Sequence, residues 1–190
     1  MKNENELKLH LGCGDNYLPG FKHIDIDPKP HLDWCNNISN LKMIQDETVD
    51  EIYTCGSFHY FDREEAVDVL KEWYRVLKPK AKLRVAGIGD FEKIIQVYLG
   101  SGKNLNARGI LGPLFGRWHL QTESRYIYQK TCYDFNSLKQ VLSDAGFTNI
   151  KKYNWQDFLP DDYDDYSKAY IPHMDENGLL MCLNVVCEKC

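Results

Sequence analysis

The chain is predicted to fold as an α/β domain with a mostly parallel sheet, helices on both faces and a reversed last strand. Short apolar segments alternate with amphipathic helical segments along its 190 residues, which is typical of parallel α/β sheets. The first apolar segment runs into Gly12-Cys13-Gly14, where ligands bind in such sheets. The last two apolar segments, 147–155 and 179–186, have no helical pattern between them, which indicates an antiparallel pair.

The expected strands are short and end in polar or glycine-containing turns. Residues 7–11 and 21–26 form two apolar runs, and a polar stretch with Pro28 and Pro30 follows. The segment 48–55 (TVDEIYTC) is rich in β-branched and aromatic residues and ends at Gly56-Ser57, which predicts a third strand.

The expected helices carry their own start and stop signals. In 63–77 the apolar residues recur at three- and four-residue steps, Asp62 precedes them and Pro79 follows, which predicts a capped amphipathic helix. A strand is expected at 82–88, and further helices at 90–99 and 134–145. Both of these helices begin with an aspartate that can serve as N-cap.

The chain is expected to be one domain, 1–190, with a lid or substrate-binding insertion around 100–130. That stretch is rich in glycine and aromatic residues and has no clean period. Long irregular segments inside compact domains often carry function. The length is sufficient for a single buried core.

Composition excludes several classes of protein. The formal net charge is −5, and the short basic run 78–84 is too small for a nucleic-acid surface. No apolar run approaches the roughly 20 residues of a membrane span. The polar start gives no sign of a signal peptide. The seven cysteines are odd in number and scattered, as in reducing compartments, so we expect a cytoplasmic location. The terminal Cys187 and Cys190 are interpreted as a frayed strand end rather than a zinc or redox motif.

The glycine loop is unusually short for a dinucleotide site. The third glycine of a dinucleotide fingerprint is replaced by Tyr17, and Pro19-Gly20 stops any helix after about one turn. A pyrophosphate would therefore lose the helix N-terminus that normally binds it, which disfavours NAD. A nucleoside with an amino-acid tail fits better. Asp25 is the candidate for its ribose hydroxyls, because a carboxylate offers two acceptor oxygens, and Asp27 is the second choice.

Four segments in this order and spacing, LHLGCG, HIDID, TVDEIYTCGSFHYF and VLKEWYRVLKPKAKLRVAG, resemble class I S-adenosylmethionine-dependent methyltransferases. The compressed opening and the ending DDYSKAYIPHMDENGLLMCLNV resemble, more narrowly, small methyltransferases encoded with polysaccharide biosynthesis genes. The resemblance covers nearly the whole chain. It implies a Rossmann-like sheet of seven strands and S-adenosylmethionine as cofactor.

The resemblance also implies a set of cofactor-binding residues. Gly12 and Gly14 would face the methionine moiety, Asp25 the ribose, Asn37-Ile38 the adenine, and Cys55-Gly56-Ser57 the sulfonium. Asparagine at position 37 departs from the family, which usually has an acid there. The complete set is Gly12, Cys13, Gly14, Asp25, Ile26, Asn37, Ile38, Cys55, Gly56 and Ser57.

Methyl transfer to a hydroxyl depends on alignment and on a base that removes the proton. The candidates are His59, which follows the strand 48–55, and His173, which we expect to act with Asp165 and Tyr166 in a segment folded over the site. The alternative for His59 is a role in shaping a turn, and for His173 a structural loop. Related proteins often have histidine where this chain has Gln129.

The expected function is O-methylation of a sugar or glycan hydroxyl. The alternatives are methylation of a small molecule or an amine, and a cofactor-binding paralogue without activity. No metal is expected, because the acidic loop Asp161, Asp162, Asp164 and Asp165 lacks the spacing of a cation site. The sequence leaves the oligomeric state open.

Overall fold

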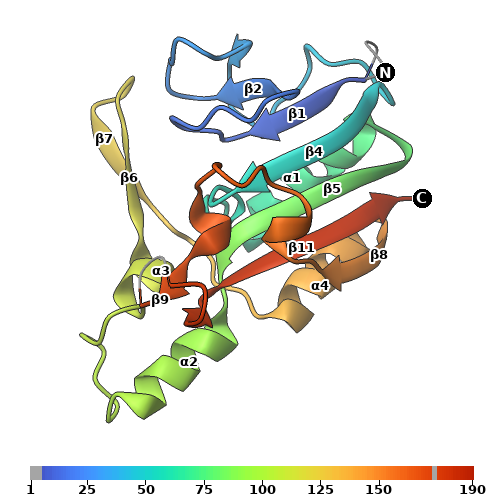
Figure 1. Cartoon of the computed structure of the whole chain (residues 1–190). Helices are drawn as coiled ribbons and strands as arrows, with labels where there is room; N and C mark the ends of the chain where they lie inside the picture. Colours follow the sequence, from blue (N-terminus) through green and yellow to red (C-terminus); the bar gives the residue numbers. More distant parts are fainter. Residues whose placement is uncertain (1–5, 173–174) are drawn as a thin grey trace.

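A seven-stranded sheet forms the centre of the computed structural model, which describes residues 6–172 and 175–190. The strand order is β3-β2-β1-β4-β5-β11-β8. All neighbouring strands are parallel except β11, which runs antiparallel to both β5 and β8. The prediction of a mostly parallel sheet with a reversed last strand is therefore confirmed (Figure 1).

The strands of the main sheet are β1 (Lys8–Leu11), β2 (Lys22–Asp25), β3 (Trp34–Cys35), β4 (Val49–Cys55), β5 (Leu77–Gly89), β8 (Phe147–Lys152) and β11 (Cys182–Lys189). Two hairpins lie outside it, β6 (Arg117–Leu120) with β7 (Arg125–Tyr128) and β9 (Tyr170–Ile171) with β10 (Leu179–Leu180). The helices are α1 (Arg63–Val76), α2 (Phe91–Gly100), α3 (Leu111–Phe115) and α4 (Phe135–Asp144). Short 3-10 turns are η1 (Phe58–Tyr60), η2 (Trp155–Asp157) and η3 (Tyr166–Lys168).

The three predicted helices form where their capping residues stand. The Asp62 side chain accepts hydrogen bonds from the backbone N–H groups of Glu64 and Glu65, and the Asp62 N–H donates to the Glu65 carboxylate. This reciprocal pair is a capping box, which satisfies donors that the first helical turn leaves free. Asp134 forms a capping box with Ser137 at the start of α4, whereas Asp90 caps α2 by accepting the Glu92 N–H alone.

Three boundaries differ from the prediction. β5 begins at Leu77, directly after α1. The turn around Lys80, whose φ is +65°, lies within the strand, where the pairing of β5 with β4 is irregular. β11 continues to Lys189, so Cys187 is part of a strand and buried, not frayed. The predicted strand 147–155 stops at Lys152, and Trp155 begins a 3-10 turn.

One face of the sheet packs against α1 and α4 in the main hydrophobic core. Leu11 of β1, Ile52 of β4 and Val85 of β5 contribute buried side chains to it. Trp73 of α1 is fully buried there, and its indole N–H donates to the Ile38 carbonyl at 2.8 Å. This core therefore ties the loop after β3 to the centre of the domain.

The other face has no α-helix between β1 and β2, because their connection is too short for one. The segment 155–168, with the 3-10 turns η2 and η3, covers it instead (Figure 1). Tyr53 and Cys55 of β4 pack with Trp155, Leu159 and Tyr163 in a second cluster. Helical turns thus lie on both faces, but on this face they are single turns.

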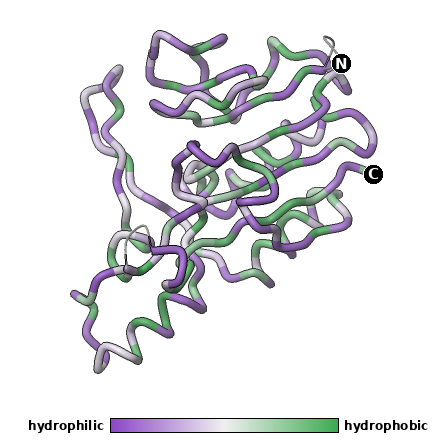
Figure 2. The backbone as a smooth tube through the Cα atoms, in the orientation of Figure 1, coloured by the Kyte–Doolittle hydropathy of each residue, from purple (hydrophilic) through white to green (hydrophobic). Residues whose placement is uncertain are grey.

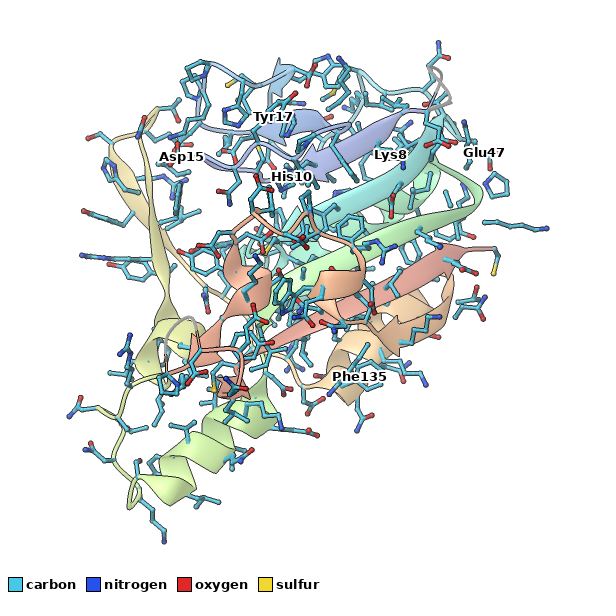
Figure 3. The ribbon with its side chains drawn as sticks, viewed as in Figure 1. Lys8, His10, Asp15, Tyr17, Glu47 and Phe135 are labelled. Carbon is cyan, nitrogen blue, oxygen red and sulfur yellow. The ribbon has the colours of Figure 1, made fainter. Side chains whose placement is uncertain are left out.

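A cavity of about 560 Å³ remains on this face near the beginnings of β1 and β2. Lys8, Lys22, Tyr17 and His31 are among its lining residues. Lys8 and Tyr17 lie toward opposite ends of β1 (Figure 3).

No helix in the described part of the chain is both long and apolar enough to cross a membrane. Hydrophilic residues interrupt the hydrophobic ones along the whole chain (Figure 2).

Buried His10 is expected to make stability depend on pH. Burial, with smaller contributions from His23 and His31, lowers its pKa to about 3. An unfolded histidine titrates near 6.5, so below that pH the unfolded state binds the proton preferentially. The contribution of His10 to the free energy of unfolding is therefore fully present above pH 6.5. It falls by about 1.4 kcal/mol per pH unit as the pH drops toward 3.

Urea unfolding at several pH values measures this effect. His10→Phe should flatten the slope of unfolding free energy against pH between 6.5 and 4, whereas His119→Phe at an exposed position should leave it unchanged. Equal slopes for wild type and His10→Phe would contradict the assignment.

Candidate functional site

The glycine loop follows β1 at the edge where the parallel strands end. Gly12 and Gly14 have φ values of +66° and +56°, a region that residues with a side chain rarely adopt. The Gly12 N–H donates to the Ile24 carbonyl at 2.8 Å. A Cβ at Gly12 would lie 2.2 Å from Ser57 Oγ. Glycine at position 12 is therefore required both by its backbone angle and by the space around it.

Asp25 lies at the end of β2, is 7% exposed, and joins the glycine loop to the chain beyond the strand. Its Oδ2 accepts the Gly14 N–H at 2.8 Å, and its Oδ1 accepts the Asp27 N–H at 3.0 Å. A carboxylate has about four lone-pair positions, so each oxygen can still accept a hydroxyl proton. The residue predicted for the ribose is thus held in place by the loop predicted for the methionine moiety.

The predicted adenine-side residues differ in their placement. Ile38 is buried, and its Cδ1 lies 3.5 Å from the position of a Cβ at Gly12. Asn37 is exposed, and its Oδ1 accepts both the N–H and the hydroxyl of Ser39. Ile26 is half-buried. Burial raises the pKa of the Cys13 thiol to about 12, so Cys13 is a neutral residue in the loop.

The end of β4 meets the glycine loop directly. Ser57 donates its hydroxyl proton to the Gly12 carbonyl at 3.0 Å. Gly56 has a φ of +66° and donates its N–H to the Ala86 carbonyl. Cys55 is 8% exposed, and burial raises its thiol pKa, as does the charge of Asp165. The structure therefore brings residues 12, 14, 25, 38 and 55–57 together at one edge of the sheet.

Asp165 and Tyr166, predicted for the acceptor side, lie over the ends of β4 and β5. A Cβ at Gly56 would be 2.9 Å from Tyr166 Cδ2, and one at Gly87 would be 3.0 Å from Tyr166 Cβ. Asp165 accepts the Tyr53 hydroxyl at 2.5 Å and the Ser167 N–H at 2.8 Å. Tyr166 is 64% exposed, so its ring is open to a ligand.

His59 is buried in η1 and ties two segments together through its backbone. Its carbonyl accepts the N–H groups of Lys130 and Thr131. Burial lowers its pKa to about 4, so the imidazole is uncharged and weakly basic at neutral pH. This placement agrees with the alternative role in shaping a turn. His173 lies outside the described residues.

The sequence did not reveal the β6–β7 hairpin, which lies beside the glycine loop (Figure 1). Trp118 of β6 has ring atoms 3.8 Å from the position of a Cβ at Gly14. Thr122 at the hairpin tip donates its N–H and its hydroxyl to Asp27 Oδ1 at 3.2 and 3.1 Å. The two short alternating runs RWHL and RYIY around a polar turn are the signal that could have identified the hairpin.

Two other predicted positions stand apart from this edge. Gln129 lies at the base of the hairpin, with its Nε2 2.6 Å from the position of a Cβ at Gly116. Asp161, Asp162 and Asp164 are exposed. Within residues 6–172 and 175–190, no group of three histidine, cysteine or acidic side chains is arranged to hold a metal ion.

Comparisons with known proteins match part of the chain to methyltransferases. Residues 22–85 match the family described as methyltransferase domain. A curated Schizosaccharomyces pombe protein named uncharacterized methyltransferase is 36% identical over 115 residues, which is 60% of this chain and 39% of that protein. The chain thus spans well under half of that relative.

Solved structures share the fold. A Burkholderia thailandensis 1,6-didemethyltoxoflavin-N1-methyltransferase, bound to S-adenosylhomocysteine, has a TM-score of 0.54 at 12% identity, covering 96% of this chain and 70% of its own. A Methanosarcina mazei S-adenosylmethionine-dependent methyltransferase has a TM-score of 0.54 at 16% identity, covering 98% and 93%. At these identities the likeness concerns the fold.

The chain thus has the fold of class I S-adenosylmethionine-dependent methyltransferases, and residues 22–85, about a third of it, match a methyltransferase domain. Its strand-end glycines, Asp25 and Ile38 lie close together at one edge of the sheet.

Two glycine variants separate backbone strain from crowding. Gly12→Ala and Gly20→Ala both place alanine at positive φ, but a Cβ at Gly20 meets nothing within 4 Å. Each should lose about 1–2 kcal/mol of stability from the backbone alone. Gly12→Ala should also displace Ser57 and weaken S-adenosylhomocysteine binding more than tenfold.

Thermal unfolding and calorimetric titration measure the two effects. Gly20→Ala should bind like wild type. Equal binding by Gly12→Ala and Gly20→Ala would show that the contact between Gly12 and Ser57 does not shape the site.

Proposed function

We propose that the protein transfers a methyl group from S-adenosylmethionine to a hydroxyl group of a sugar or glycan. The observation that carries the cofactor assignment is Asp25, whose carboxylate accepts the N–H groups of both Gly14 and Asp27. It keeps two acceptor positions for the hydroxyls of a ribose. Ser57 leaves no room for a side chain at position 12. Only backbone groups of Gly12 are therefore available to the amino-acid end of the cofactor.

The cofactor, when bound, supplies an electrophilic methyl group on a sulfonium. The chain contributes alignment, since displacement at a methyl group requires the nucleophile in line with the leaving group. Gly12, Gly14 and Asp25 would hold the two ends of the cofactor. Cys55 and Gly56 would lie beside its centre, and Tyr166 above Gly56 would border the acceptor.

Asp165 is the residue proposed to receive the proton of the acceptor hydroxyl. Its carboxylate accepts two protein donors, Tyr53 and Ser167, and these fix its position next to β4. Tyr166, the next residue, adds an aromatic ring beside it, and Tyr60 lies near Tyr166. Burial raises the pKa of Tyr60 to about 12, with a further contribution from Tyr166, so Tyr60 is a neutral hydroxyl. Aromatic surfaces with a few placed polar groups are typical of small-ligand sites.

His173 stays a proposed companion of Asp165. The sequence places it eight residues further along the same segment. His59 is the weaker candidate for the base, because its pKa of about 4 makes it a poor proton acceptor at neutral pH.

Methyl release with a panel of acceptors tests this assignment. Sugars and sugar nucleotides should be methylated by wild type. Asp165→Asn should lower turnover about 100-fold or more, because general bases contribute that order of rate, while S-adenosylhomocysteine affinity stays within about twofold. Asp161→Asn, an exposed residue of the same loop, is the matched control and should be fully active.

The panel also contains amines, because the Burkholderia relative is named for methylation at a nitrogen. Methylation of amines alone, or wild-type turnover in Asp165→Asn, would contradict the hydroxyl proposal. Turnover that survives His173→Ala would remove His173 from the site.

A further inference from the structure

The β6–β7 hairpin has two different faces. Arg117 pairs with Tyr128, and His119 pairs with Tyr126, on a face where the two tyrosines are 53% and 49% exposed. Trp118 and Leu120 alternate with these residues and therefore point the other way. Leu120 is only 2% exposed. The hairpin thus has an outer face open to solvent and an inner face packed against the domain.

The inner face lies on the glycine loop. The Trp118 ring atoms Cζ2 and Cη2 are 3.8 Å from the position of a Cβ at Gly14, which is ordinary van der Waals contact. Asp15, the next residue, lies at the end of β1 that faces the hairpin (Figure 3). A large aromatic side chain therefore covers the backbone that is proposed to hold the cofactor.

The tip of the hairpin is fastened to Asp27. Both donors of Thr122 reach Asp27 Oδ1, and Asp27 is 1% exposed. Burial alone would raise the pKa of Asp27. Hydrogen-bonding groups of Gln121, Thr122 and Trp118 outweigh that effect and lower it. The buried carboxylate is therefore charged at neutral pH.

The second oxygen of Asp27 is unpaired. Oδ2 is buried and makes no hydrogen bond of normal geometry among the described residues, although the Gln121 backbone and the Trp118 side chain lie close enough to lower the pKa of the carboxyl group. The nearby Lys29 is engaged with Asp15 at 2.7 Å. A buried charged oxygen without a donor is costly. The Asp27 N–H donates to Asp25, so this free oxygen stands next to the carboxylate proposed for the ribose.

We propose that the β6–β7 hairpin is the outer wall of the cofactor site and that it controls cofactor release. Trp118 covers the bound cofactor over the glycine loop. Thr122 and Asp27 form a latch that keeps the hairpin closed, and Asp27 Oδ2 accepts a hydroxyl of the cofactor. This inference rests on the proposed function. It assigns the hairpin to the cofactor, although its place in the sequence suggested a lid or a substrate insertion.

Dissociation of S-adenosylhomocysteine from the full chain, followed by stopped-flow displacement, tests the latch. Thr122→Val removes one donor to a charged acceptor and should speed dissociation about tenfold, as expected for the loss of such a hydrogen bond. Thr122→Ser keeps both donors and should behave like wild type. Trp118→Ala should weaken equilibrium binding about tenfold, and Trp118→Phe less. Tyr126→Ala on the outer face is the matched control and should change neither quantity.

Protection from trypsin provides a second readout that needs no variant. S-adenosylhomocysteine should slow cleavage after Arg125 in the hairpin of the wild-type chain. Wild-type binding with unchanged dissociation in Thr122→Val and Trp118→Ala would overturn the hairpin assignment alone. A wild-type chain that binds no S-adenosylhomocysteine would overturn the proposed function, and the latch with it.

Discussion

The carboxylate of Asp25 is the contact on which the candidate site depends. Its two oxygens bind the N–H groups of Gly14 and Asp27, so it joins the glycine loop to the chain that leaves β2. Charge-assisted hydrogen bonds of this kind are stronger than neutral ones. Through Asp27 the same connection continues to Thr122 and the β6–β7 hairpin. The glycine loop, the end of β2 and the distant hairpin are thus connected through two neighbouring acids, Asp25 and Asp27.

The short connection between β1 and β2 has a second consequence on the open face of the sheet. Without a helix there, Tyr53 and Cys55 would be exposed, and burying such apolar surface is a principal source of stability. The segment 155–168 covers them. That covering also places Asp165 against the Tyr53 hydroxyl and Tyr166 over Gly56. The compressed loop at the proposed cofactor side is therefore linked to the residues that border the proposed acceptor side.

Local patterns predicted much of the fold. The helices α1, α2 and α4 were identifiable because their apolar spacing and aspartate caps are local signals. The glycine loop and Asp25 were identifiable because a strand end, a tight turn and an acid follow within a few residues. The start of β5 was wrong because the irregular pairing with β4 depends on a neighbouring strand.

Long-range contacts were beyond such patterns. Asp27 and Thr122 are 95 residues apart, and Tyr53 and Asp165 are 112 apart. No periodicity or spacing in the sequence indicates that these pairs of residues are in contact. The hairpin strands are four residues each, too short to stand out within a glycine-rich stretch. The fold was therefore more predictable than the site, because helices and strands depend on neighbours in sequence and the site depends on contacts between distant segments.

Calorimetric titration of wild type and Asp25→Asn with S-adenosylhomocysteine and with NAD tests the central claim most directly. In the variant an NH₂ group replaces one of the two acceptor oxygens. This donor would then lie against the N–H of Gly14 or of Asp27, which is also a donor. Wild type should bind S-adenosylhomocysteine and give no binding heat with NAD, and the variant should bind S-adenosylhomocysteine at least tenfold more weakly. Equal affinity in the two proteins, or preferential binding of NAD, would contradict the role of Asp25 and the occupant assigned to the site.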